Sequence, residues 1–286
     1  SGDDRNCYKG VIDNSVNLLQ AKDSRGKVLF TIVNYAKHPT TQGADNRLVS
    51  ADWVWGMRAE IEKSIEGQTM YIQGPEAAIH AGPMEKEVGG DNWDFTYNVG
   101  KAVAEVVLAA LPSLTAANDF EILSRSGKTT CVGDGGLLLI AEQYFKVPKR
   151  SITPIYADGD ADDSDAVRST PIAYRINEIE VSWHKLGPAE FAVFPGEPSP
   201  AYGLLAKSHM ISPYRFAVAF GNDAIGYLVD PDSLANDPSV GQNGPEDKGQ
   251  LRGYEVTMGM GEAAGPCVWD AVTALGWFDG IYKTAR

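Results

Sequence analysis

The sequence predicts an α/β fold in which a mixed or largely parallel sheet is layered with helices. Strand-like and helix-like segments alternate along the N-terminal part of the chain, an order typical of this class. The composition is that of a globular protein, with 43% hydrophobic and 22% charged residues. A chain of 286 residues can bury a sizeable core. We therefore expect residues 1–286 to form a single α/β domain, with an internal subdivision near residues 112–130 as the alternative.

Four alternating segments make up the N-terminal part. The first strand is rich in β-branched and aromatic residues, which indicates a buried strand. The first helix is indicated by Val54, Met57 and Ile61, which recur at helical spacing with charged residues between them. The expected segments are a strand at 27–35, a helix at 51–66, a strand at 70–73 and a helix at 98–111.

The rest of the chain predicts shorter strands and one further clear helix. Strand-like segments lie at 132–140, 176–183, 190–194 and 215–220, a helix at 202–209, and short elements at 254–257 and 271–275. Residues 150–170 are polar and predict an exposed loop. The aspartates at 158–165 imitate part of a calcium loop but lack its glycine and its final glutamate, so a solvated loop is the preferred interpretation.

Charge, hydropathy and cysteine usage exclude several classes of partner. The net charge is −13 and no Lys/Arg cluster is present, which argues against a nucleic-acid ligand. No apolar run is long enough to predict a transmembrane segment. Cys7, Cys131 and Cys267 form no CxxC pair, which argues against a cysteine zinc site and leaves either one disulfide or free thiols.

Two histidines follow predicted strands at the points where those strands end. His38 comes just after the strand at 27–35, and His80 follows the strand at 70–73. Ligands of open α/β sheets gather where strands end, so the two histidines are expected to converge. We predict His38 as a metal ligand, with a purely structural histidine as the alternative.

Further polar residues occupy similar positions. Glu197 lies between prolines after an apolar strand and is a candidate metal ligand. Tyr227 lies beside glycines and either packs or directs its phenol into a site. Ser50 and Asp52 precede the first helix, where the plain interpretation is an N-cap and the functional one a contact with substrate.

In their order, these segments resemble the neutral (alkaline, non-lysosomal) ceramidase family. The resemblance runs from about residue 10 to about residue 265, and each motif is specific only in combination with the others. It rests on NYAKHPT at 34–40, LVSADWVWG at 48–56, the glycine turn at 73–74, FPGE at 194–197, and the segment 222–227 with GYE at 253–255.

The resemblance implies a zinc-dependent hydrolase that cleaves an N-acyl amide bond in a ceramide-like or other lipid amide. The family's zinc ligands fall on His38, Glu197 and Tyr227, which are nitrogen and oxygen donors suited to zinc. Zinc would polarise the amide carbonyl and lower the pKa of a bound water. We expect Asn222, which lies in the motif that leads to Tyr227, to contact the substrate together with the start of the first helix.

Two departures from the family pattern matter. The family carries another zinc histidine in an upstream HTHSGP segment, which this chain lacks. We therefore expect the chain to be the C-terminal portion of a larger enzyme, whose N-terminal chain or segment completes the site. The family's GDxSP serine is also absent, and Glu76 and His80 lie near its place as candidate general bases.

Two other functions stay open from the sequence. A zinc esterase or small acyl-amide hydrolase would keep the metal, and a processed Ser1 would be its alternative nucleophile. A catalytically silent relative would bind lipid or a partner protein. The family resemblance and a start without Met indicate a secreted or periplasmic protein.

Overall fold

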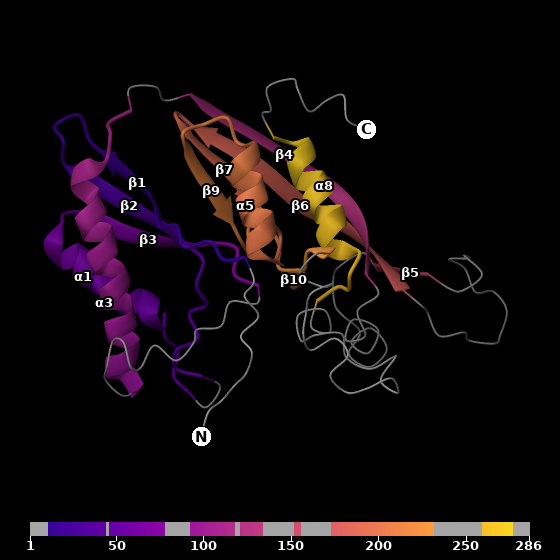
Figure 1. Ribbon diagram of the computed structural model, residues 1–286, viewed down its shortest axis with the longest axis horizontal. Coiled ribbons are helices and arrows are strands. Elements are labelled where there is room, and N and C mark those ends of the chain that lie inside the picture. Colours follow the sequence, from indigo (N-terminus) through magenta and orange to yellow (C-terminus); the bar gives the residue numbers. More distant parts are fainter. Residues whose placement is uncertain are drawn as a thin grey trace.

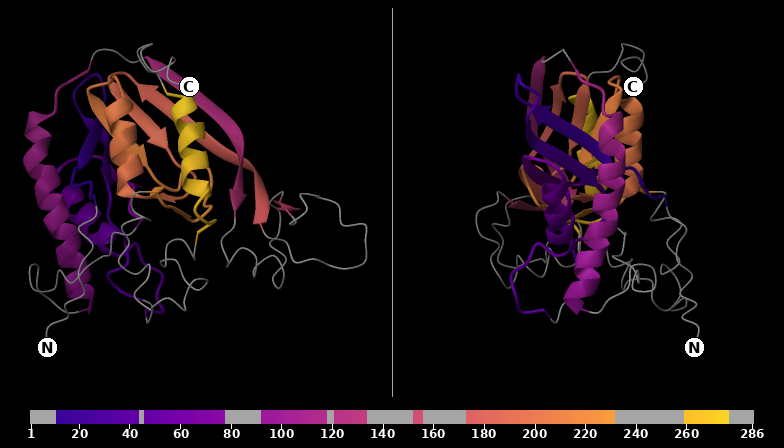
Figure 2. Two further views of the ribbon diagram at one scale, coloured as in Figure 1. Left: turned by 45° about the vertical axis from the view of Figure 1, so that its right-hand side comes forward. Right: turned by 90° about the vertical axis from the view of Figure 1, so that its left-hand side faces the viewer.

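The computed structural model has a mixed α/β architecture built on two main sheets, each covered by two helices (Figure 1). Helices α1 and α3 cover the smaller sheet, and helices α5 and α8 lie against the larger one, as both views of Figure 2 also show. The predicted α/β class is confirmed. The structure describes residues 11–43, 46–77, 92–117, 121–133, 152–155, 173–231 and 259–276.

The smaller sheet has three strands in the order β1-β2-β3, namely β1 (Asn17–Lys22), β2 (Val28–Tyr35) and β3 (Gln68–Gln73). The β1–β2 pair is antiparallel and the β2–β3 pair is parallel. Helix α1 (Trp53–Ser64) connects β2 to β3. This crossover matches the strand, helix and strand predicted from the sequence, whereas β1 was not predicted.

Helix α1 packs against α3 (Asn92–Ala110), which is followed by the short 3-10 helix η1 (Leu111–Ser113). The predicted apolar stripe of α1 faces this contact and is buried. Gly56 and Gly100 lie where the two helices meet, and a Cβ added at Gly100 would overlap the Trp53 carbonyl and the Met57 amide nitrogen. The helices therefore approach closely because both crossing positions are glycines.

The larger sheet has the order β4-β6-β7-β9, with β5 also paired to β6. Its strands are β4 (Ile122–Gly133), β5 (Ile152–Ile155), β6 (Ala173–Leu186), β7 (Ala189–Val193) and β9 (Tyr214–Val218). Only the β7–β9 pair is parallel, so this sheet is mixed rather than largely parallel. Helices α5 (Pro200–His209) and α8 (Ala264–Ala274) share one apolar core with it.

Several predicted boundaries need correction. The helix expected at 98–111 begins at Asn92, the short element expected at 271–275 belongs to the longer helix α8, and β5 lies within the region expected to be an exposed loop. Of the strand predicted at 132–140, only residues 132–133 lie in the described part of the chain, and they are the end of β4, which begins at Ile122. Most side chains of its first nine residues are exposed or half-buried, and several are polar, so apolar patterning gave no signal there. Residues 134–140, 158–165 and 254–257 lie outside the described part of the chain.

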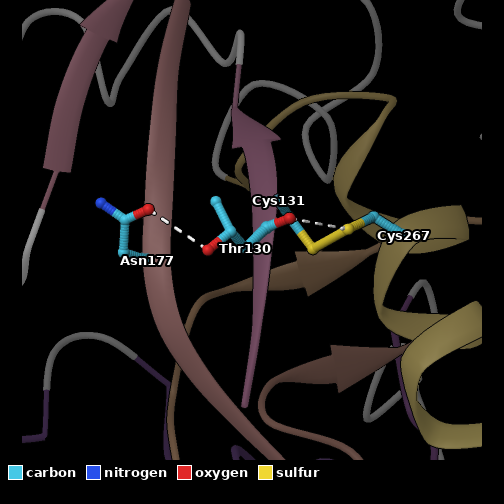
Figure 3. The surroundings of a disulfide bond; sticks show 4 residues. All are labelled: Thr130, Cys131, Asn177 and Cys267. Atoms are coloured by element: carbon cyan, nitrogen blue, oxygen red, sulfur yellow. Dashed lines mark hydrogen bonds between the residues drawn. A yellow bond between two sulfur atoms is a disulfide. The ribbon is translucent and has the colours of Figure 1, made fainter.

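A disulfide joins Cys131 on β4 to Cys267 on α8 (Figure 3). It resolves the alternative between paired and free thiols for these two cysteines, and Cys7 lies outside the described residues. Within the described ranges, no helix combines the length and the apolar character that crossing a membrane requires.

Short polar links join the two sheets near the C-terminal ends of β2 and β3. Asn34 Nδ2 donates to the carbonyls of Ile72 (3.1 Å) and Ala217 (3.0 Å), and the Ala219 amide donates to the Gln73 carbonyl (2.9 Å). A small parallel pair, β8 (Glu197–Pro198) with β10 (Tyr227–Leu228), follows β7 and β9 in the chain. These links bring the segments after β2, β3 and β7 together.

Candidate metal centre

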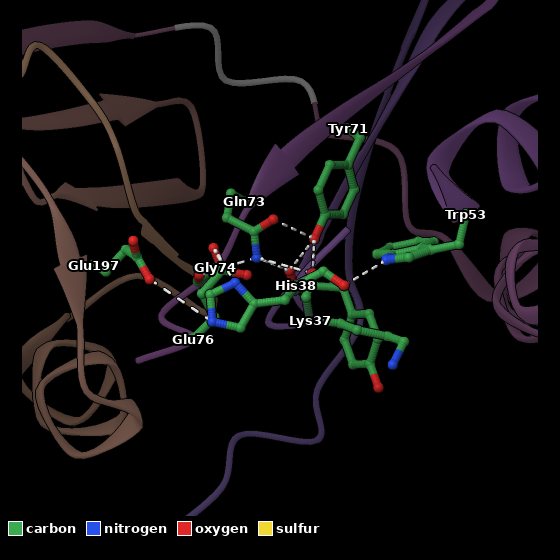
Figure 4. A network of polar contacts seen from close by, with 9 residues as sticks. Lys37, His38, Trp53, Tyr71, Gln73, Gly74, Glu76 and Glu197 are labelled. Carbon is green, nitrogen blue, oxygen red and sulfur yellow. Dashed lines mark hydrogen bonds and ion pairs between the residues drawn. The ribbon is translucent and has the colours of Figure 1, made fainter. Parts of the chain in front are cut away.

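Three side chains from separate segments converge at this junction (Figure 4). His38 follows β2, Glu76 follows β3 and Glu197 opens β8. The distance from His38 Nδ1 to Glu76 Oε1 is 3.4 Å, and that from His38 Nε2 to Glu197 Oε2 is 3.7 Å. One ligand atom from each residue lies within 4.8 Å of the others, a spacing that suits a single metal ion.

The electrostatics of the centre favour a bound cation. The Glu76 side chain is 1% exposed, and its Oε2 accepts no hydrogen bond from the described residues. Burial, with the nearby charge of Glu197 as the second cause, raises the pKa of Glu76 to about 9. A divalent cation between these groups would offset both effects. The residues present therefore fit a metal with nitrogen and oxygen ligands, such as zinc.

The backbone around His38 is held by side chains from α1 and β3. Trp53 Nε1 donates to the His38 carbonyl at 3.0 Å. Gln73 Nε2 and the Tyr71 hydroxyl each donate to the Lys37 carbonyl at 3.2 Å. None of these three supports was predicted from the sequence, because each partner is at least fifteen residues away along the chain.

Asp52 shapes the loop that follows His38. Its carboxylate accepts from the amides of Thr41 (3.0 Å), Gln42 (2.9 Å) and Trp53 (2.7 Å), and Ser50 Oγ accepts from the Asp52 amide (2.7 Å). Asp52 has a φ of 52°, a strained conformation for a residue with a side chain. These contacts support the N-cap interpretation of this segment, while contact with substrate stays a prediction.

Glu197 and Tyr227 are direct partners in the β8–β10 pair. The Glu197 amide donates to the Gly226 carbonyl (2.9 Å). A Cβ added at Gly196 would overlap that carbonyl, so the close approach of the two segments requires glycine there. Paired residues of neighbouring strands share a face of the ladder, which puts Tyr227 on the same side as Glu197.

The two remaining predicted residues are less directly connected to the centre. Asn222 lies in the loop before β10 with a φ of 70°, and its Nδ2 donates to Ser182 Oγ at 2.9 Å. Ser182 Oγ also lies 2.9 Å from His184 Nε2, so Asn222 is tied to the larger sheet. His80 lies outside the described residues.

A groove of about 400 Å³ lies elsewhere on the molecule. It is open and combines apolar residues with the side chains of Lys207 and Arg215. None of its lining residues belongs to the His38, Glu76 and Glu197 cluster. Its lining includes Val16, Leu18, Leu114, Lys207, Tyr214 and Phe216.

The fold is similar to that of solved ceramidases. A crystal structure of neutral ceramidase from Pseudomonas aeruginosa matches with a TM-score of 0.60 and 15% identity, over 92% of this chain and 45% of that one. A ceramidase structure complexed with C2 matches with a TM-score of 0.59 and 14% identity, over 96% and 48% respectively. The chain thus spans about half the length of both. No protein-family model and no curated protein matches the sequence.

Proposed function

We propose that this chain carries the metal centre of a zinc-dependent hydrolase that cleaves an N-acyl amide bond in a ceramide-like or other lipid amide. The observation that carries the proposal is the convergence of His38, Glu76 and Glu197 within a fold similar to that of ceramidases. Three segments far apart in sequence supply these groups, and one oxygen of the buried Glu76 carboxylate, Oε2, accepts no hydrogen bond from the described residues.

His38, Glu197 and Tyr227 are the residues that would hold zinc. When bound, zinc polarises the amide carbonyl and makes a coordinated water acidic. His38 is held in place through its own carbonyl by Trp53, and Glu197 is held through its amide by Gly226. These contacts hold the backbone from which both ligand side chains extend.

The cluster of His38, Glu76 and Glu197 contains a single histidine. Because the family resemblance implies another zinc histidine upstream, an N-terminal segment that supplies it is part of the proposal. The two ceramidase structures are about twice as long as this chain, which is compatible with such a segment.

The disulfide between Cys131 and Cys267 supports the export predicted from the sequence. Disulfides persist in oxidising compartments and are rare in the cytosol. Secretion or a periplasmic location stays part of the proposal.

Hydrolysis of a small panel of substrates tests the proposed reaction. N-acyl sphingosines of short and long acyl chain, an N-acyl amino acid and an acyl ester should be offered to the wild type, to His38→Ala and to the control His209→Ala. We expect amide hydrolysis that a chelator abolishes and added zinc restores, and a loss of about 100-fold or more in His38→Ala only. Turnover that survives both the chelator and His38→Ala would refute the proposal.

Two other outcomes of that panel identify the alternatives. Zinc binding without hydrolysis of any substrate would favour a silent lipid-binding or partner-binding protein. Preference for the ester over every amide would favour a zinc esterase.

A further inference from the structure

We infer that Glu76 is the carboxylate that orients His38, by accepting the Nδ1 proton, and that the metal is bound by His38 Nε2. This inference rests on the proposed metal centre, and it assigns Glu76 a positioning role in place of the general-base role expected from the sequence. It also leaves Glu76 outside the set of direct metal ligands.

The two ring nitrogens of His38 face different carboxylates. Nδ1 lies 3.4 Å from Glu76 Oε1, and Nε2 lies 3.7 Å from Glu197 Oε2 (Figure 4). One metal ion binds one nitrogen of an imidazole ring, since the two lone-pair directions point away from each other. The carboxylate at the other nitrogen is then a hydrogen-bond acceptor.

Two observations select Nε2 as the metal donor. Tyr227 is the register partner of Glu197, so a second oxygen donor lies on the Nε2 side. The Glu197 side chain as a whole is 16% exposed and that of Glu76 only 1%, so the Glu197 side of the ring is the less enclosed of the two, although Glu197 Oε2 itself is buried. The Nε2 side therefore combines more donors with better access.

The segment that carries Glu76 is anchored on both strands that carry the ligands. The Gly74 amide donates to the Tyr35 carbonyl (3.0 Å), three residues before His38. The Ala77 amide donates to the Pro198 carbonyl (3.2 Å), directly after Glu197. Glu76 is thus held between the two ligand segments, as a residue that fixes the ring orientation and tautomer of His38 must be.

The experiment measures zinc affinity in wild type, Glu76→Gln, Glu76→Ala, Glu197→Gln and the surface control Glu180→Ala, by competition with a chromophoric chelator. The visible spectrum of the Co²⁺-substituted proteins reports the donor set. Glutamine still accepts the Nδ1 proton through its amide oxygen, whereas alanine does not. We expect Glu76→Gln to stay within about 3-fold of wild type and Glu76→Ala to bind zinc about 10–100-fold more weakly.

Each other outcome overturns the assignment. A loss in Glu76→Gln as large as that in Glu197→Gln, with a changed Co²⁺ spectrum, would make Glu76 a direct ligand. Wild-type zinc affinity in both Glu76 variants with lost turnover would make it a general base. Wild-type affinity and turnover in both would leave it no role at the centre. A wild type without zinc would instead defeat the proposed function itself, so the two failures are distinguishable.

Discussion

The carbonyl of His38 connects the candidate metal centre to the buried side chains around it. Trp53 is fully buried, its indole nitrogen donates to that carbonyl, and its ring meets the rings of Tyr35 and Tyr71 edge-on. A change at Trp53 should therefore affect the loop that carries His38, the proposed metal ligand, although Trp53 itself is not a candidate ligand.

Replacing Trp53 with phenylalanine should weaken both folding and metal binding. The variant lacks the indole N–H, so the His38 carbonyl loses this hydrogen bond. The loss should lower the free energy of unfolding by about 1–3 kcal/mol. Zinc affinity should fall several-fold. Urea unfolding and zinc competition measure the two effects.

Trp55→Phe is the matched control, because Trp55 lies on the same helix and is 47% exposed. Its change in unfolding free energy should stay within about 0.5 kcal/mol, the range of surface substitutions. Equal losses of stability and zinc affinity in the two variants would show that the hydrogen bond from Trp53 to the His38 carbonyl is not the cause.

The ion pair between Asp13 and Lys207 should make stability depend on pH. Burial acts to raise the pKa of Asp13, but the hydrogen bonds from Lys207 (2.6 Å) and Ser15 outweigh it, so the pKa lies below its ordinary value. A lowered pKa stabilises the fold above the unfolded-state pKa of about 3.9 and loses that contribution as pH falls through the folded-state pKa.

Unfolding of the wild type and Asp13→Asn should therefore be compared across pH. The wild type should be more stable at pH 7, and its advantage should decline once the pH falls below about 4. An advantage that stays constant down to pH 2 would exclude this ion pair as its source.

The sequence was sufficient to name His38 and Glu197 as candidates because each follows a predicted strand, and the family resemblance added Glu76 and the ligand role of Tyr227. It was insufficient to separate their roles. Those roles depend on which ring nitrogen of His38 each carboxylate faces, and that is decided by contacts between segments that are far apart in the sequence.

At the scale of elements, the close crossing of α1 and α3 depends on glycine. Gly100→Ala would force a Cβ into the backbone of Trp53 and Met57, which cannot move as a flexible side chain would. We expect a loss of about 2 kcal/mol or more in unfolding free energy, as overpacking predicts. Chemical denaturation measures it.

Gly127→Ala is the control for that substitution. A Cβ there would meet only a side-chain carbon of Leu275 at 3.7 Å, an ordinary contact. Its stability should stay close to that of the wild type. A Gly100→Ala protein as stable as Gly127→Ala would contradict the close helix contact.

Some elements were predictable and others were not, for a physical reason. Strand β2 and helix α1 have strong apolar patterning because they bury residues such as Val33, Met57 and Ile61. Strands β1 and β4 are paired on one side only and carry many exposed or half-buried side chains, so they lack that pattern.

At the scale of the whole molecule, the disulfide closes a loop of 136 residues between β4 and α8. In the chain-entropy model, a crosslink over such a length stabilises the native state by about 3–5 kcal/mol. Reduction should therefore lower the unfolding midpoint clearly.

Thiol titration in denaturant provides the independent check. The sequence contains three cysteines, so the non-reduced protein should expose one thiol and the reduced protein three. Three reactive thiols before reduction, or an unfolding midpoint insensitive to reductant, would contradict the disulfide.

The overall class was predictable from the alternation of elements, but the pairing of the strands was not. Both sheets are mixed, and the small β8–β10 pair that holds Glu197 beside Tyr227 is only two residues long in each strand. A ladder of that length has no periodic signature, so only the fold reveals it.

Zinc stoichiometry and affinity test the central claim most directly. The metal-stripped wild type, His38→Ala, Glu197→Gln and the control His209→Ala should be titrated with zinc against a chromophoric chelator. The wild type and His209→Ala should each bind one zinc ion, and His38→Ala and Glu197→Gln should bind it about 100-fold more weakly or worse. A wild type that binds no zinc, or ligand variants that bind it as tightly as the wild type, would contradict the account.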